Sequence, residues 1–222
     1  MAVEYPNATF VGIDIAINPD GTINDTDNIR LIPKNCQFQQ IDILKEIILP
    51  PNSFDYIYQR FLYTVYSLNQ VESKFKEFVG LLKPGGYMEL VEYDLHPKQI
   101  GPKFTLIIKA YANVVTSQNK ELYHGPHLKQ CLTDAGLEDI NGDYISIPIC
   151  WGGNMGKILY ELINEVLSQF GAILWPWLEL EGEYDKDVYF EFVDSAFNEC
   201  VEYKTYFNLH WATGRKPLNK AN

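Results

Sequence analysis

Two aspartates close apolar, strand-like segments, and their carboxylates could bind a ligand. Asp14 ends the run V-G-I-D at Val11–Asp14, and Asp42 lies in the run F-Q-Q-I-D-I at Phe38–Ile43. If these segments are strands of an open parallel sheet, both acids lie at its carboxyl edge, where such sheets bind ligands. A carboxylate there accepts strong hydrogen bonds from hydroxyl or amino groups. Alternatively, Asp14 forms a turn and Asp42 caps a short helix or turn that begins at Leu44.

The stretch Ser53–Asp94 contains the clearest strand–helix–strand pattern. Phe54–Tyr58 is aromatic and β-branched, which is typical of a buried strand, and Val71–Leu82 has apolar residues at helical spacing. The sequence K-P-G-G at Lys83–Gly86 predicts a turn that ends the helix, before a second strand over Tyr87–Val91. This pattern predicts a βαβ unit, and therefore a parallel sheet with a right-handed crossover.

Segments that resemble strands and segments that resemble helices also alternate along the rest of the chain. Asn18–Asn28 is polar and predicts a loop, and Leu44–Leu49 predicts a short helix or turn. Helices are predicted over Phe104–Thr116, His127–Ala135, Met155–Phe170 and Val188–Cys200. Strands are predicted over Thr9–Ile15, Cys36–Ile43, Ile140–Pro148 and Tyr203–Thr213. The fold class is therefore α/β, with a doubly wound and mostly parallel sheet.

Composition narrows the class of protein. The 222 residues are 46% hydrophobic, which suits one globular domain, and the net charge of -11 argues against nonspecific binding to nucleic acid or an anionic membrane. No apolar run approaches the ~20 residues that cross a bilayer, and the N-terminus lacks the pattern of a signal peptide. We therefore expect an intracellular protein, cytoplasmic or nuclear, with no nucleic-acid or membrane partner. Its oligomeric state is left open.

No metal site is predicted from the potential ligands. The four cysteines have no C-x-x-C spacing, and without a secretory signal they are expected to be reduced thiols. His124 and His127 in H-G-P-H could both bind a metal, but two ligands do not make a site. A turn followed by the start of a helix is the simpler interpretation of this segment.

The order of these motifs resembles the class I S-adenosylmethionine-dependent methyltransferases. F-D-x-I followed by L-K-P-G-G is similar to their fourth strand, fourth helix and fifth strand, while V-G-I-D and F-Q-Q-I-D-I fit their second and third strands. The run E-Y-P-x-A-x-F-x-G-x-D at Glu4–Asp14 resembles the fungal LaeA-like methyltransferases. The resemblance covers roughly residues 1–150 and, weakly, the C-terminal end. It implies a Rossmann-like fold and S-adenosyl-L-methionine as the cofactor.

The resemblance also assigns candidate cofactor-binding residues in the first part of the chain. Asp14 would accept hydrogen bonds from the ribose hydroxyls, with Ile15 beside it. Asp42 would accept a hydrogen bond from the adenine amino group, and Ile43 would pack on the adenine ring. Both aspartates would form charge-assisted hydrogen bonds, which are stronger than hydrogen bonds between neutral groups.

A second pair of candidates follows the strand that carries Asp55. Gln59 and Arg60 would lie along the methionine end of the cofactor, although Arg60 could instead pair with a carboxylate on the surface. Asp55 itself is more readily structural. Methyl transfer depends mainly on positioning the donor and the acceptor, so no catalytic residue is named. The acceptor, a small molecule or a protein, is not identified by the sequence.

One motif of the family has no counterpart in the printed sequence. The glycine-rich loop E-x-G-x-G-x-G, which lets the backbone approach the cofactor closely, does not occur, and Met1–Asn7 resembles the end of the first crossover helix. The expected sheet therefore lacks the first strand of the family. Either Thr9–Ile15 pairs directly with Phe54–Tyr58, or two strand edges stay open. The alternative function is a catalytically inactive, truncated relative that acts as a binding or interaction protein.

We expect a single methyltransferase-like domain over residues 1–222. Residues 1–150 would form the core sheet and its helices, 151–202 a helical insert or cap, and 203–217 a final antiparallel strand. The tryptophans of this second part, Trp151, Trp175 and Trp177, would either line a substrate cavity or form the core of the insert. A nicotinamide-dependent oxidoreductase fits less well, because L-K-P-G-G does not belong to that class.

Overall fold

A computed structural model describes residues 1–18, 32–120, 122 and 124–218. The chain forms two compact units, Met1–Pro50 and Pro51–Asn222, and each is described by itself. The loop predicted at Asn18–Asn28 lies almost entirely outside the described residues.

The first unit is built on two parallel strands, β1 (Phe10–Asp14) and β2 (Cys36–Gln40). Their register runs from Phe10 opposite Cys36 to Asp14 opposite Gln40. Gly12 lies opposite Phe38, and a Cβ atom at Gly12 would come within 2.6 Å of the Phe38 ring, so glycine lets this ring lie across the strand pair.

The segment before β1 is fastened to the same strand pair by one side chain. The amide nitrogen of Asn35 donates to the carbonyl oxygens of Ala2, Tyr5 and Ala8 at 2.9–3.1 Å. After β2, the segment predicted as a short helix or turn forms a turn, in which the Lys45 amide donates to the Asp42 carbonyl oxygen at 3.0 Å. The first unit therefore presents two strand ends and a tight turn at one edge.

The second unit contains a four-stranded mixed sheet in the order β3-β4-β6-β5. Its strands are β3 (Phe54–Arg60), β4 (Leu82–Lys98), β5 (Glu138–Pro148) and β6 (Tyr206–Arg215). The pair β3 and β4 is parallel, whereas β6 runs antiparallel to both β4 and β5. The predicted βαβ unit thus supplies one edge of this sheet, and the antiparallel β6 joins it to β5.

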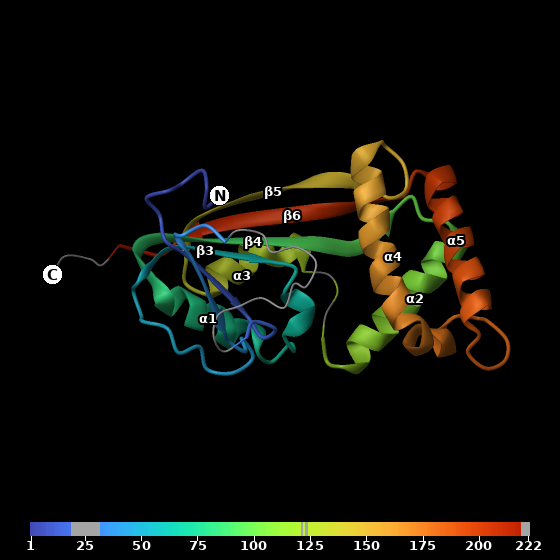
Figure 1. Ribbon diagram of the computed structural model, residues 1–222, viewed down its shortest axis with the longest axis horizontal. Coiled ribbons are helices and arrows are strands. Elements are labelled where there is room, and N and C mark those ends of the chain that lie inside the picture. The colour runs from blue at the N-terminus through green and yellow to red at the C-terminus, as the bar shows by residue number, and fades with distance from the viewer. Residues whose placement is uncertain (19–31, 121, 123, 219–222) are drawn as a thin grey trace. The chain divides into compact units, whose positions relative to one another are not determined.

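Helices lie along this sheet and beyond one end of it. They are α1 (Val71–Leu81), α2 (Pro102–Ser117), α3 (Leu128–Asp134), α4 (Asn154–Leu174) and α5 (Lys186–Tyr203), with the 3-10 helices η1 (Tyr63–Val65), η2 (Gly125–His127) and η3 (Trp175–Trp177). Figure 1 shows α1 and α3 beside the strands, while α2, α4 and α5 gather where β4 and β6 reach the other end. No helix in the described ranges is long and apolar enough to span a bilayer.

The helices α2, α4 and α5 share one apolar core. Phe104 and Phe197 pack with their ring centroids 6.1 Å apart, and Leu174 and Tyr189 are completely buried beside them. Close packing of this kind removes apolar surface from water, and this burial stabilises the folded state by about 25 cal/mol for each Å² of apolar surface. The helical end therefore has its own source of stability and supports the strands that run into it.

The strands β3 and β4 are staggered. Arg60, the last residue of β3, lies opposite Val91, but β4 continues to Lys98 with β6 as its strand neighbour. The residues Glu92–Lys98 thus extend past the end of β3 toward the helices. This extension, which was not predicted from the sequence, carries side chains that line the cavity described below.

The segment Lys83–Gly86 is not the separate turn that the sequence predicted. It belongs to β4, which begins at Leu82, and the register against β3 shifts between Phe54 and Tyr56. Gly85 has a left-handed φ of 82° and donates its N–H to the Lys216 carbonyl at 2.9 Å. The K-P-G-G sequence therefore makes an irregular strand start, held by the chain after β6.

The two alternatives predicted for the strand edges stay predictions, because β1 and β3 belong to different units. The described strands form two separate sheets, in which β1 pairs with β2 and β3 pairs with β4. Each of β1 and β3 has one strand neighbour. The helices α4 and α5 occupy the predicted insert, and β6 occupies the segment predicted as the final antiparallel strand. The single-domain organisation stays a prediction.

A first prediction concerns the start of α5. The Asp185 side chain caps this helix by accepting from the amides of Asp187 and Val188 at 2.9 and 3.1 Å. Asp185→Ala should lower the free energy of unfolding by about 0.5–2 kcal/mol, because two amides lose their partner. Urea denaturation measures the loss. Glu181→Ala, an exposed acid in the same loop, is the matched control, and an equal effect of both variants would contradict the assignment of the cap.

Candidate functional site

Asp14 and Asp42 lie at the same edge of the first unit. The Asp14 carbonyl oxygen accepts from the Ile41 amide at 3.2 Å, which places Asp42 one residue further along that edge. The Asp14 carboxylate is exposed and accepts from the Ala16 amide at 2.8 Å. The Asp42 carboxylate accepts from the Leu44 amide at 3.0 Å and lies 3.4 Å from the Lys45 ammonium.

These local bonds are the turn and cap interactions that the sequence offered as alternatives to ligand binding. They do not use up the carboxylates, since an ionised carboxylate has about four acceptor positions. Ile15 is 63% exposed beside Asp14, and Ile43 is partly buried beside Asp42. Their proposed roles toward a cofactor stay predictions, with the side chains available at the edge where the sequence placed them.

Gln59 carries an unsatisfied donor in the interior of the second unit. The residue is only 4% exposed, and its side-chain oxygen accepts from the Tyr66 hydroxyl at 2.9 Å. Its amide nitrogen Nε2 has no hydrogen-bond partner among the described residues. A buried polar group without a partner costs about 1–3 kcal/mol, so an acceptor from a ligand or a water molecule is expected there.

Arg60 and Asp55 differ in their surroundings. The Arg60 guanidinium lies 5.2 Å from the centroid of the Phe61 ring and forms no ion pair with a described carboxylate. The Asp55 carboxylate pairs with Lys83 at 2.8 Å near the start of β3, away from the end that carries Gln59. Asp55 is therefore a structural residue. The Arg60 side chain is exposed at the end of β3.

Phe61 makes the turn out of β3 in a conformation that is uncommon for its residue type. Its φ is 57°, in the left-handed region, and its amide donates to the Val91 carbonyl at 3.1 Å. The Phe61 ring stacks on Tyr93 with centroids 4.8 Å apart and planes 9° apart. Strained backbone persists where the surroundings fix it, and functional sites are common places for it. Here it directs an aromatic ring into a cavity.

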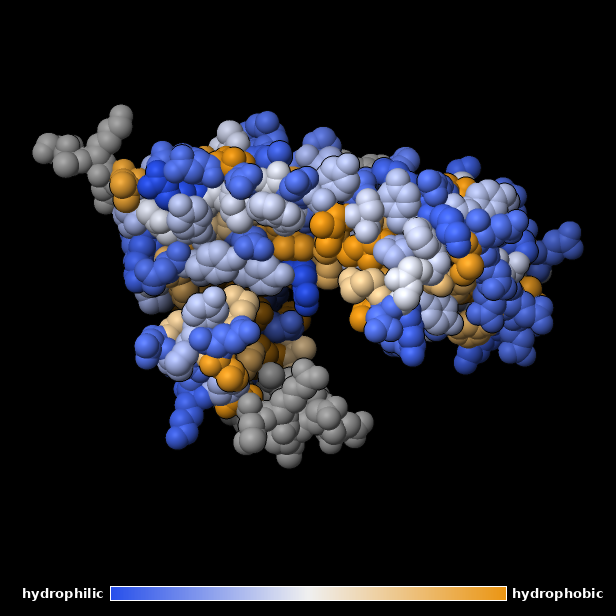
Figure 2. Space-filling view, turned by 90° about the horizontal axis from the view of Figure 1, so that it is seen from above, coloured by the Kyte–Doolittle hydropathy of each residue, from blue (hydrophilic) through white to orange (hydrophobic). Residues whose placement is uncertain are grey.

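That cavity has a volume of about 250 Å³ and an almost entirely apolar wall. Its lining comes from the turn at Phe61 after β3, the extension of β4, the helices α2 and α4, the segment with Leu122 and His124, and β6. Figure 2 shows apolar side chains reaching the surface beside the helical end of this unit. Sequence reasoning did not find the cavity, because its walls come from elements far apart along the chain.

The three tryptophans for which the sequence predicted either a cavity or a core position do not line this cavity. Trp175 is buried in the helical core and donates to the Gly182 carbonyl at 3.0 Å, while Trp151 donates to the Thr205 carbonyl at 2.6 Å. Trp177 is about half exposed. None of the three lines the cavity, and the alternative of a structural role describes Trp175 and Trp151 better.

Polar groups reach this cavity at only a few positions. Glu92, 6% exposed, accepts from the Leu62 amide at 2.8 Å, and His124 is buried nearby in the same wall. Burial raises the pKa of the Tyr93 and Tyr111 hydroxyls, so both stay protonated and can donate. An apolar space with one acid and a few donors can hold a small apolar molecule in one orientation.

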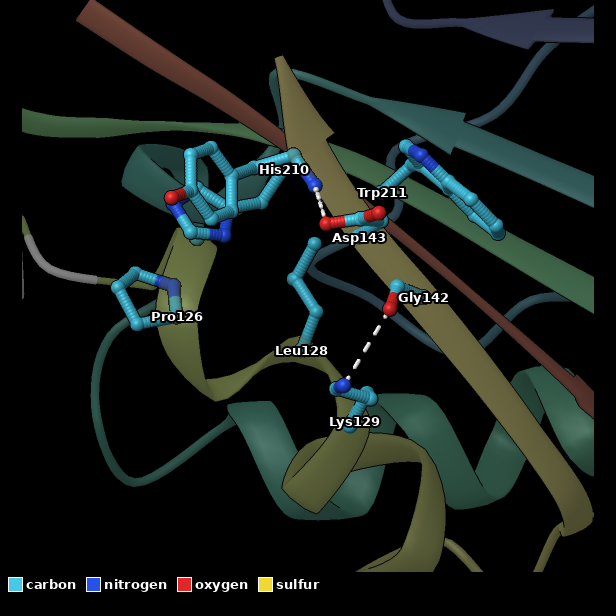
Figure 3. A pocket seen from close by; sticks show the side chains of 9 residues that line it. Pro126, Leu128, Lys129, Gly142, Asp143, His210 and Trp211 are labelled. Atoms are coloured by element: carbon cyan, nitrogen blue, oxygen red, sulfur yellow. Dashed lines mark hydrogen bonds between the residues drawn. The ribbon is translucent and has the colours of Figure 1, made fainter. Parts of the chain in front are cut away.

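A second hollow of similar volume lies between η2, α3 and the strands β5 and β6 (Figure 3). Lys129 donates to the Gly142 carbonyl at 3.3 Å across it, and Asp143 accepts from the Tyr144 amide at 2.9 Å. The His210 ring packs on Tyr144 with centroids 5.1 Å apart. Two of its polar groups are thus already paired within the chain, and no group of three metal-ligating residues occurs among the described residues.

Comparisons with known proteins find relatives by sequence over parts of this chain. No protein-family model matches the chain. It is 27% identical over 157 residues to methyltransferase str3 of Strobilurus tenacellus, covering 67% of this chain and 51% of that protein. It is 30% identical over 132 residues to phosphoethanolamine N-methyltransferase 3 of Arabidopsis thaliana, covering 59% of this chain and 24% of that protein. The chain thus spans about half the length of one relative and a quarter of the other.

The solved structures establish the fold class. The crystal structure of the [4+2]-cyclase SpnF matches with a TM-score of 0.51 at 14% identity, over 96% of this chain and 67% of that one. The predicted α/β, Rossmann-like fold is confirmed. The relatives by sequence are both methyltransferases. At 14% identity the likeness to SpnF concerns the fold alone.

A second prediction concerns His210 in the hollow of Figure 3. Burial lowers the pKa of its imidazole below the ordinary value of about 6.5, and its Nε2 has no partner among the described residues. The folded state thus binds the proton more weakly than the unfolded state. The contribution of His210 to stability is present above about pH 6.5 and is lost as the pH falls through the folded-state pKa.

His210→Gln should therefore reduce the loss of unfolding free energy between pH 8 and pH 5.5, as measured by urea denaturation at both values. Asp94 and Asp143 oppose the shift, and Lys98 adds to it. The control is His127→Gln, which changes an exposed histidine at the end of η2. If His210→Gln and the wild type lost equal free energy, the partly buried imidazole would not be the source of this pH dependence.

Proposed function

We propose that this protein transfers a methyl group from S-adenosylmethionine to an acceptor molecule. The observation that carries the proposal is the buried Gln59 amide at the carboxyl end of a parallel strand, whose Nε2 has no acceptor among the described residues. Ligands of open α/β sheets bind at such ends, and an unsatisfied amide there suits an anionic or carbonyl group. The methyltransferase relatives support the choice of reaction.

The residues present fit this cofactor chemically. The Asp14 carboxylate would accept from the ribose hydroxyls and the Asp42 carboxylate from the adenine amino group, with Ile15 and Ile43 as apolar neighbours. The Gln59 amide would donate to the carboxylate of the methionine portion. Arg60, with an exposed guanidinium at the end of β3, could add a second and charged donor to the same carboxylate.

When bound, the cofactor supplies a methyl group that is activated by a positively charged sulfur. The protein's own task is to bind, orient and keep water away, because aligned reactants in a dry site need no protein nucleophile. The apolar cavity beyond β3 suits this task, since Phe61 and Tyr93 stack in its wall within a few residues of Gln59. The acceptor, a small molecule or a protein, would approach through this cavity.

A non-catalytic binding or interaction protein is the second candidate. One observation favours it: the Asp14 and Asp42 carboxylates already accept hydrogen bonds from nearby amides. The structural neighbour SpnF is named as a cyclase, so this fold also hosts other activities. The LaeA-like specificity suggested by Glu4–Asp14 is likewise a proposal that rests on that motif.

Titration calorimetry with S-adenosylhomocysteine tests the proposal. Asp14→Ala should weaken binding by about 1.5–3 kcal/mol, the range for a hydrogen bond to a charged group, and Gln59→Met by about 0.5–1.5 kcal/mol. The matched control is Asp55→Ala, which removes an acid whose partner is Lys83 and should leave affinity unchanged.

Two outcomes would count against methyl transfer. If the wild-type chain showed no saturable binding of S-adenosylhomocysteine, the non-catalytic candidate would be preferred. If binding were saturable but Asp14→Ala and Gln59→Met matched Asp55→Ala in affinity, the cofactor would bind elsewhere. Circular dichroism of each variant establishes that the fold is retained.

A further inference from the structure

The cavity beyond β3 has the composition of a binding site for an apolar molecule. Its walls are aromatic and aliphatic side chains from β4, α2, α4, β6 and the segments at Phe61 and Leu122, and its volume of about 250 Å³ lies below the ~300–1,000 Å³ typical of sites for drug-sized ligands. A ligand of this site is therefore small. A peptide segment or a highly charged metabolite would have to lose its hydration without gaining polar partners in return.

One acidic side chain interrupts this apolar wall. Glu92 lies on the extension of β4, just beyond the register position of Arg60, and is 6% exposed. One of its oxygens accepts from the Leu62 amide at 2.8 Å, which fixes the carboxylate in place. A carboxylate can accept several hydrogen bonds, and such bonds are strong where water is excluded. Glu92 can therefore also bind a ligand group that carries an O–H or N–H.

Glu92 is also close to the proposed cofactor residue. Tyr66 donates to the Gln59 side chain at 2.9 Å. Gln59 lies opposite Leu90 in the register of β3 and β4, and Glu92 is two residues further along β4, on the same face as Leu90. A ligand group held by Glu92 would lie near a molecule held by Gln59, as transfer between the two requires.

We propose that this cavity binds the methyl acceptor, and that the acceptor is a small, largely apolar molecule with one hydroxyl or amino group that donates a hydrogen bond to Glu92. The inference rests on the proposed function and names the substrate class of the same site. The apolar walls select the body of the molecule, and the single buried acid selects and orients its reactive end.

Two aromatic probes separate these contributions. 2-Naphthol has an apolar ring system and one donor, and 2-methoxynaphthalene has the same rings with the donor replaced by a methyl ether. Titration of the wild-type protein without cofactor, followed by probe fluorescence, should show one site that binds 2-naphthol at least tenfold more tightly. Equal affinities, or no saturable binding of either probe, would overturn the proposal, and this comparison needs no variant.

Variants then locate the site. Leu162 lines the cavity on α4 and is 45% exposed, while Ile158, one turn earlier, is 59% exposed and outside the lining. Leu162→Trp should weaken 2-naphthol binding at least tenfold by filling the cavity, and Ile158→Trp should leave it unchanged. Glu92→Gln, which keeps an oxygen for the Leu62 amide, should weaken 2-naphthol at least fivefold and leave 2-methoxynaphthalene unchanged.

Parallel titration with S-adenosylhomocysteine separates the two proposals. If 2-naphthol binds as expected but S-adenosylhomocysteine does not, the cavity assignment stands and methyl transfer fails. If S-adenosylhomocysteine binds while Leu162→Trp and Ile158→Trp affect 2-naphthol equally, the cavity assignment is overturned and methyl transfer stands. Circular dichroism melts of each variant identify any loss of fold.

Discussion

The stagger between β3 and β4 is the constraint on which the second unit depends. Because β3 ends at Arg60 opposite Val91, the last part of β4 is left with β6 as its strand neighbour. The helices α2 and α4 and the turn at Phe61 contribute their apolar side chains beside this extension. If β3 ran as far as β4, a strand would lie next to Glu92. Register therefore decides that the second unit has a cavity at this point.

A few buried polar groups provide the hydrogen-bonding positions in this apolar region. Gln59, Tyr66 and Glu92 are all removed from water, and each buried polar group costs free energy unless it is hydrogen-bonded. The Tyr66–Gln59 and Leu62–Glu92 bonds offset part of this cost, but the Gln59 amide nitrogen remains unsatisfied among the described residues. The backbone of Phe61 adds local strain at the same place. A bound ligand that accepts a hydrogen bond from the Gln59 amide would offset part of this cost.

Local sequence patterns predicted most of the elements, and they failed where distant residues decide the outcome. The aromatic run at Phe54–Tyr58 and the spacing of apolar residues in α1 and α4 depend on neighbours a few positions away, so these elements were predictable. The strand start at Lys83–Gly86 was not, because Lys216 holds it from the far end of the chain. The cavity joins Phe61 to α4 and β6 across more than half of the chain, which no local pattern records. Gln59 was predicted as a candidate by family resemblance, but its unsatisfied amide depends on the orientation imposed by Tyr66.

We propose that the end of β3 binds the cofactor through the Gln59 side chain. Nuclear magnetic resonance of the side-chain amide groups tests it most directly, with the Gln59 signal assigned by its disappearance in Gln59→Met. On addition of S-adenosylhomocysteine, we expect the Gln59 amide protons to shift downfield and to exchange more slowly with water, because Nε2 gains an acceptor. Saturable binding of S-adenosylhomocysteine that leaves the Gln59 amide signal unchanged would contradict the account.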